Sequence, residues 1–177
     1  MKKLKDTAII PECYVDTNLT ETLTGIICNH QKGCPNVVKQ MKEKRTDRFA
    51  LGIIDKDKRQ VGYIDEFSKI VGNEHLEVLK HKSRPHYIVY IIPAIEAFIL
   101  SAATEQRINL TDYGLPTELE TLKRHTKQQD SKNDPRFSNL FKAIKETTSF
   151  KLLGKLILYL LEHPYDAEEK EIVSMFK

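Results

Sequence analysis

The pattern of apolar and polar residues divides the chain into an alternating part before Gly114 and a helical part after it. In the first part, short runs rich in β-branched residues alternate with segments whose apolar residues recur every three or four positions. This alternation is typical of strands joined by crossover helices, so we predict an α/β fold with a mainly parallel sheet flanked by helices. The expected strands are 7–10, 25–28, 49–54, 76–79 and 86–92, and the expected helices are 16–22, 35–44, 62–71 and 94–107.

From Pro116 onward the pattern is helical throughout. The helix candidates are 117–128, 135–147, 150–162 and 167–176. We therefore predict an α/β domain over residues 1–114 and a helical extension over residues 115–177 that packs on it. A broad apolar face at 152–161 is expected to form the core between extension and sheet, with a partner-binding surface as the alternative.

Composition indicates a soluble globular protein, with 40% hydrophobic and 30% charged residues in a chain of 177. The odd number of cysteines, three, favours a reducing compartment over a disulfide framework. No apolar stretch approaches the length of a membrane span, and no signal-peptide core follows the basic first residues. We expect a cytoplasmic protein without membrane contact. A net charge of +3 does not by itself indicate a nucleic-acid partner.

Candidate chemistry gathers at two pairs of carboxylates, each placed where an apolar run ends. Glu12 and Asp16 follow the first predicted strand, and Asp55 and Asp57 follow the third. Ligand sites in open α/β sheets lie at the carboxyl ends of strands. Four carboxylates at one edge would repel each other unless a cation neutralised them, and oxygen ligands of this kind suit Mg²⁺ or Mn²⁺. The sequence therefore predicts a divalent metal site.

Each of these residues also has a purely structural interpretation. Asp16 would cap a helix, and Asp55 and Asp57 would be solvated turn residues. Glu96 lies at the opening of a predicted helix, where a carboxylate favours the helix dipole whether or not it binds metal. A third cluster, Cys28, His30 and Cys34, supplies three of the four ligands that structural zinc requires, so a strand-end turn is the preferred interpretation there.

The motif Glu12-x-x-x-Asp16, followed by Asp55-x-Asp57, resembles the Toprim domain of bacterial primases, type IA and type II topoisomerases and overcoming-lysogenisation-defect nucleases. Cys13 stands where glycine commonly follows the glutamate in that family. The segment 92–100, which contains Glu96, resembles the Pro-x-x-Glu-x-Phe-Leu-type segment of Toprim-like families encoded near bacterial defence and ATPase genes. The resemblance covers roughly residues 6 to 100.

The resemblance implies a Toprim-like sheet and a Mg²⁺-dependent nuclease or related phosphotransfer activity on nucleic acid, in prokaryotic genome defence or DNA maintenance. The expected metal ligands are Glu12, Asp16, Asp55, Asp57 and Glu96. Glu12 would also act as general acid or base. The alternative is a non-catalytic Toprim-like module that binds an ATPase or another protein. Oligomeric state is left open.

Cations close in sequence to the proposed site edge are expected to contact phosphates. They are Lys58, Arg59, Lys80, Lys82 and Arg84. For the basic run at 80–84, a solvated loop is the alternative. The helical extension shows no constellation that suggests chemistry, so we expect it to contribute no catalytic residue.

Overall fold

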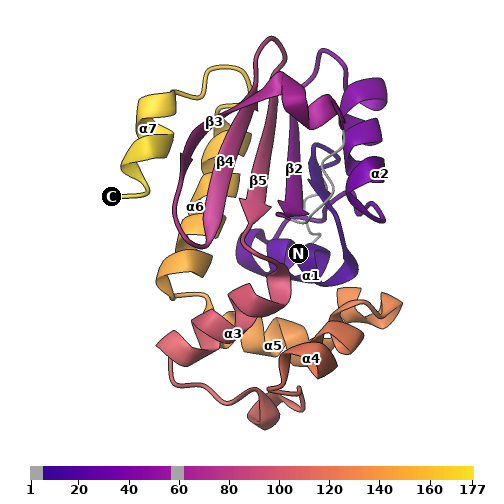
Figure 1. The fold of residues 1–177 in the computed structure, drawn as a ribbon, viewed down its shortest axis with the longest axis vertical. Helices are drawn as coiled ribbons and strands as arrows, with labels where there is room; N and C mark the ends of the chain where they lie inside the picture. The colour runs from indigo at the N-terminus through magenta and orange to yellow at the C-terminus, as the bar shows by residue number, and fades with distance from the viewer. Residues whose placement is uncertain (1–5, 57–61) are drawn as a thin grey trace.

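The computed structural model describes residues 6–56 and 62–177, which build a five-stranded sheet with helices packed on it (Figure 1). The strands are β1 (Ile9–Pro11), β2 (Ala50–Asp55), β3 (Phe67–Gly72), β4 (Leu76–His81) and β5 (His86–Ile91). Their order across the sheet is β1-β2-β5-β4-β3, in which β1, β2 and β5 are parallel while β4 and β3 are antiparallel to their neighbours. The α/β class is confirmed. The sheet is mixed rather than mainly parallel, because short turns connect β3 to β4 and β4 to β5.

Helices make up most of the remaining chain. They are α1 (Tyr14–Thr24), α2 (Cys34–Lys39), α3 (Ile95–Glu105), α4 (Leu119–Thr126), α5 (Pro135–Ile144), α6 (Thr148–Glu162) and α7 (Glu169–Ser174). A π-helical segment, η1 (Gln40–Lys44), extends α2, and the short 3-10 helices are η2 (Gly62–Glu66), η3 (Leu110–Tyr113) and η4 (Gln129–Lys132). None of the described helices is long and apolar enough to cross a membrane.

Two predicted elements are wrong. The helix expected at 62–71 is instead η2 followed by strand β3. Ile64, Phe67 and Ile70 recur at a spacing that suits a helix, but pairing of β3 with β4 decides the backbone conformation. The strand expected at 25–28 is reduced to an isolated bridge at Ile27, whose carbonyl accepts the N–H of Asp6 at 3.0 Å.

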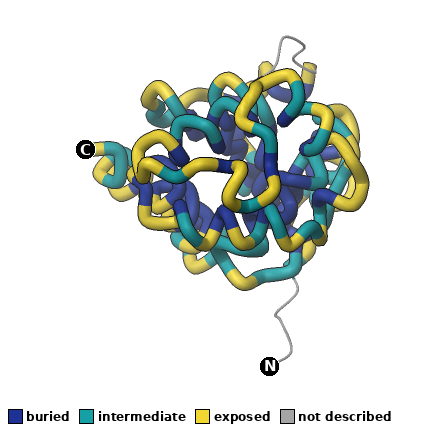
Figure 2. Tube along the Cα trace, turned by 90° about the horizontal axis from the view of Figure 1, so that it is seen from below, coloured by how far each residue is buried: buried dark blue, intermediate teal, exposed yellow. Residues whose placement is uncertain are grey.

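The sheet separates two hydrophobic cores, one on each face. The side chains of β5 alternate between these two cores. Tyr87, Val89 and Ile91 belong to the larger core, which also contains buried residues of α1, α3, α5 and α6. Ile88 and Tyr90 belong to the smaller core, which contains buried residues of α2 and η2. Successive strand residues point to opposite faces, so a strand covered on both faces is apolar at every position. Exposed segments lie on the outside of the molecule (Figure 2).

The helices after residue 114 pack on the first part of the chain. Helices α5 and α6 contact α1, α6 contacts α3, and α7 contacts the edge strand β3. The apolar face of α6 is buried in the larger core, as expected for a core element. Its fully buried members are Leu153, Leu156, Ile157 and Leu160, with Leu152 at 7% exposure. Leu161 is half-buried. Because the other residues of this apolar face are buried in the larger core, the face stabilises the fold.

Candidate metal centre

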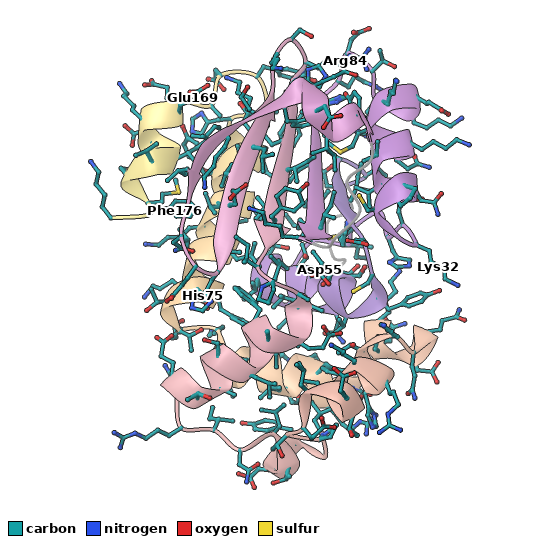
Figure 3. All side chains as sticks on the ribbon, in the orientation of Figure 1. Lys32, Asp55, His75, Arg84, Glu169 and Phe176 are labelled. Carbon is teal, nitrogen blue, oxygen red and sulfur yellow. The ribbon has the colours of Figure 1, made fainter. Side chains whose placement is uncertain are left out.

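Four carboxylates converge where β1, β2 and β5 end. Glu12 follows β1, Asp55 is the last residue of β2, and Glu96 lies in the first turn of α3, just after β5. Asp16 lies in the first turn of α1. The arrowheads of β2 and β5 point toward α1 and α3 in Figure 1, and Asp55 is labelled at this edge in Figure 3. We call Glu12, Asp16, Asp55 and Glu96 the carboxylate cluster; the predicted ligand Asp57 lies outside the described residues, as do Lys58 and Arg59.

The start of α1 fixes Asp16. Cys13 caps the helix: its Sγ accepts the N–H of Asp16 at 3.4 Å, and Asp16 Oδ2 accepts the N–H of Cys13 at 3.2 Å. This is a capping box with cysteine in the position usually taken by serine or threonine. The other oxygen, Asp16 Oδ1, is buried and has no hydrogen-bond partner in the described part of the chain.

The other three members connect neighbouring elements. Glu12 Oε1 accepts the N–H of Cys34 at 3.1 Å, and its Oε2 accepts the N–H of Asp55 at 3.0 Å. Asp55 Oδ1 accepts the N–H of Ile95 at 3.0 Å, which joins β2 to the start of α3. Buried Glu96 accepts a short hydrogen bond from the hydroxyl of Thr126 in α4. Through the hydrogen bond between Glu96 and Thr126, the cluster therefore links the part of the chain before Gly114 to the helical extension.

Burial and mutual repulsion make negative charge costly here. Burial raises the pKa of Asp55 above its usual range, and the charges of Asp16, Glu12 and Glu96 raise it further. Burial likewise raises the pKa of Asp16, with Glu12 and Glu96 adding to the effect. A bound cation reverses both effects, since opposite charge favours the ionised carboxylate.

The donor set suits a hard divalent cation by its chemistry. Across residues 6–56 and 62–177, no three His, Cys, Asp or Glu side chains already stand in the arrangement of a metal site. Instead, Glu12, Asp55 and Glu96 accept hydrogen bonds from the protein. The unpartnered Asp16 Oδ1 distinguishes this cluster from an ordinary set of caps, because a buried polar atom without a partner costs about 1–3 kcal/mol. Oxygen ligands of this kind bind Mg²⁺, so the residues fit the metal by donor type and not by their present arrangement.

A cleft of about 430 Å³ opens beside the cluster. Asp55 and Glu96 line it together with Lys56, Lys123 and Lys127. Lys123 and Lys127 come from α4 and its C-cap, so the extension supplies side chains to this cleft. Sequence reasoning missed both lysines. The available signal was their spacing of four residues, which places them on one face of a predicted helix.

The other predicted phosphate contacts, Lys80, Lys82 and Arg84, lie at the opposite end of the strands from the cluster. Lys80 pairs with Tyr87 near the start of β5, whereas Asp55 pairs with Ile91 at its end. The four residue steps from Tyr87 to Ile91, roughly 13 Å of strand, therefore separate Lys80 from Asp55 along β5. Lys82 and Arg84 lie in the β4–β5 turn, and Figure 3 shows Arg84 and Asp55 at different ends of the sheet. The structure does not bring these cations to the carboxylates.

The cysteine and histidine residues considered for zinc do not gather into a site. Cys28 is buried in the larger core, and His30 stacks on Tyr14 with ring centroids 4.3 Å apart. Cys34 begins α2. The described residues hold no group of three such ligands.

Comparison of the chain with protein-family models, curated proteins and solved structures finds no match. The Toprim resemblance therefore stays a prediction drawn from the motif residues. The features that bear on function are the carboxylate cluster and the cleft beside it.

Proposed function

We propose that this protein is a Mg²⁺- or Mn²⁺-dependent phosphodiesterase that acts on nucleic acid through a Toprim-like carboxylate site. The observation that carries the proposal is the buried, unpartnered Asp16 Oδ1 within a cluster of four carboxylates. The adjoining cleft combines Asp55 and Glu96 with three lysines. Carboxylates suit a divalent cation and lysines suit phosphate oxygens, so one cleft offers both functions that phosphodiester chemistry needs.

The residues take separate roles in this proposal. Asp16, Asp55 and Glu96 would hold the cation, with Asp57 as the further ligand that the motif predicts. When bound, the cation would polarise a phosphoryl oxygen and lower the pKa of a water. Lys127 would hold a non-bridging phosphate oxygen, and so would Lys56 and Lys123 on exchanging their ion pairs with Glu77 at 2.8 Å and Glu120 at 2.7 Å for the phosphate.

Glu12 has a positioning role in the metal-free fold. Both of its carboxylate oxygens accept backbone N–H groups, at the end of β2 and the start of α2. It thereby sets where Asp55 stands relative to α2. Its action as a general acid or base stays a prediction.

Metal binding tests the first half of the proposal. Calorimetric titration with MnCl₂ should show binding to the wild type, and Asp16→Asn should weaken it by about tenfold or more, as loss of a group that supports a metal site commonly does. Asp65→Asn is the matched control, because it makes the same chemical change at an exposed residue of η2 that is not a member of the cluster. A wild type that binds neither Mn²⁺ nor Mg²⁺, or an Asp16→Asn variant of unchanged affinity, would refute the metal site.

Cleavage of end-labelled oligonucleotides tests the second half. With Mg²⁺ present, the wild type and Asp65→Asn should cleave, while Asp55→Asn and a chelator-treated wild type should not. Metal binding without cleavage of single-stranded or duplex DNA or RNA would instead support the binding-module alternative with a protein partner such as an ATPase. The defence context rests on the family resemblance alone.

A further inference from the structure

A second and larger groove, of about 830 Å³, opens at the start of α1. We call it the α1–η4 groove; its lining includes Tyr14, His30, Gln129, Lys132, Asn133 and Arg136. Tyr14 is the first residue of α1, two positions before Asp16 of the carboxylate cluster. The groove and the cluster therefore share one helix turn.

The α1–η4 groove presents an aromatic pair. The rings of Tyr14 and His30 stack at a centroid distance of 4.3 Å with planes 22° apart, and both residues are half-buried. Flat ring surfaces at an open groove suit a planar aromatic ligand, because bases stack on such side chains without regard to sequence.

A polar atom at the aromatic pair lacks a partner. The hydroxyl of Thr17 donates to the carbonyl of Cys13 at 2.8 Å and lies 3.0 Å from His30 Nδ1. Since the hydroxyl has one proton, Nδ1 donates to it and Nε2 remains an acceptor. Nε2 is buried and has no hydrogen-bond partner among the described residues. Burial lowers the pKa of His30 and the nearby charge of Lys132 lowers it further, against a hydrogen bond with the Cys13 backbone that raises it, and the net effect favours the neutral ring.

The opposite wall supplies amides and a cation. Gln129 and Asn133 carry both donors and acceptors, as the edge of a base requires. Arg136 is paired with Asp134, with a shortest distance of 2.7 Å, which neutralises both. Lys132 lies near the aromatic pair, and Asp130 is exposed at the rim.

This wall is held in place from α1. Asn18, only 4% exposed, donates its side-chain amide to the carbonyl of Ser131 at 2.8 Å and to that of Asp134 at 3.2 Å. Segment 131–134 is thus fixed to the helix that also carries Asp16. The groove is a preformed feature of the fold.

We propose that the α1–η4 groove binds an unpaired nucleobase of a single-stranded nucleic acid, stacked at the Tyr14–His30 pair, with a neighbouring phosphate at Lys132. The inference rests on the proposed function and deepens it by naming the strandedness of the substrate. A paired base cannot enter such a groove without leaving its duplex. Tyr14 and Asp16 lie in the same turn of α1, so a strand held in this groove would lie next to the turn that carries a member of the carboxylate cluster.

Binding without metal tests this inference separately from catalysis. Fluorescence anisotropy in EDTA would compare a short labelled oligothymidylate, an abasic strand of equal length and a blunt duplex. The oligothymidylate should bind most tightly. Tyr14→Ala should weaken its binding roughly 5- to 100-fold, the range for loss of one base–aromatic stack, while Tyr14→Phe should bind like the wild type. Tyr165→Ala, which removes an exposed tyrosine elsewhere, is the control and should have no effect.

A second variant guards against a folding defect in Tyr14→Ala. Lys132→Gln should weaken binding of the abasic strand as well. It should also reduce the slope of log affinity against log salt concentration by about 0.7, since one phosphate contact is lost. Circular dichroism would establish that each variant is folded.

The outcomes separate the two proposals. Equal affinity for the abasic strand and oligothymidylate, preference for duplex, no oligonucleotide binding at all, or folded Tyr14 and Lys132 variants with unchanged affinity and salt slope would each overturn the base-binding groove. Cleavage that is independent of Tyr14 would support the phosphodiesterase activity and show that the α1–η4 groove is not part of its substrate site. Tyr14-dependent binding without cleavage in Mg²⁺ would support base binding in the α1–η4 groove and refute the phosphodiesterase activity.

Discussion

Asp16 combines a structural and a candidate chemical role within one side chain. Oδ2 completes the capping box with Cys13, while Oδ1 lies buried within the carboxylate cluster without a partner. A cap alone would be satisfied by a solvent-facing side chain, but Asp16 is 1% exposed. Burial of the Asp16 carboxyl therefore lowers the stability of the fold, as is common at functional sites.

Replacing Asp16 should stabilise the metal-free protein. Asp16→Asn keeps an oxygen for the N–H of Cys13 and removes a carboxylate whose ionisation is opposed by burial and by the neighbouring carboxylates, so the free energy of unfolding in EDTA near neutral pH should rise by about 1 kcal/mol or more. Urea denaturation monitored by circular dichroism measures this. Added Mg²⁺ should stabilise the wild type more than the variant, since the variant binds the metal more weakly. A variant less stable than the wild type in EDTA would contradict repulsion within the cluster.

His86, at the start of β5, should make the fold sensitive to acid. His86 Nε2 donates to the carbonyl of Arg45 at 3.0 Å, and Nδ1 of the neutral ring accepts from the hydroxyl of Tyr63 at 2.7 Å; the side chain is fully buried. Burial lowers its pKa. The stabilisation is therefore present above the unfolded pKa of about 6.5 and is lost as pH falls through the lower folded pKa.

His86→Gln should be less stable at neutral pH but should lose less stability on acidification. Each fully coupled proton contributes a slope of about 1.4 kcal/mol per pH unit to the unfolding free energy, and the variant should lack that contribution. Urea denaturation across this pH range provides the measurement. The exposed-residue control is His163→Gln. Equal slopes in wild type and His86→Gln would rule out the neutral buried ring.

At the scale of elements, the close approach of α2 to β2 depends on a glycine. A Cβ at Gly52 would lie 3.1 Å from Met41 Sδ and 3.2 Å from Val37 Cγ1. Both contacts belong to the smaller core, on the sheet face that α2 and η1 cover. Gly52 thus sets the distance between the helix and the strand that ends at Asp55.

Gly52→Ala should destabilise the fold by about 1–3 kcal/mol, because the extra methyl overpacks this contact. Gly62→Ala is the matched control, since a Cβ there meets nothing within 4 Å. Thermal denaturation of both variants measures the difference. If Gly52→Ala were as stable as Gly62→Ala, the helix would have room to move away from the sheet.

At the scale of the whole molecule, the helical extension belongs to the same core as the sheet. Its buried residues join those of β2, β4 and β5 in one cluster. Its α4 also supplies Thr126 to Glu96 and two lysines to the cleft. The expectation that the extension contributes no catalytic residue stays a prediction.

Leu156→Asp should unfold the protein or come close to it. Leu156 is fully buried, and an unpaired charge there costs several kcal/mol, on the order of the net stability of a small domain. Leu158→Asp is the control on the same helix, because Leu158 is 40% exposed. Circular dichroism and urea denaturation would report the difference. Equal stability of the two variants would show that α6 is dispensable for the core.

The sequence by itself determined what depends on neighbours a few residues apart. Apolar periodicity located α3, α5 and α6, and apolar runs located β2, β4 and β5, because burial of one face imposes the spacing within each element. It also placed Asp55 at a strand end and Asp16 in a first helical turn.

Only the tertiary structure decided how distant segments meet. Residues 62–71 have a helix-like spacing, yet their pairing with β4 makes part of them a strand. Thr126 reaches Glu96 across 30 residues, and Lys132 comes to His30 because Asn18 holds segment 131–134. Lys80 and Asp55 instead lie toward opposite ends of β5, because strand direction, and not distance along the sequence, sets the position of a residue in a sheet. Such contacts arise from strand order and helix packing, which local periodicity does not encode.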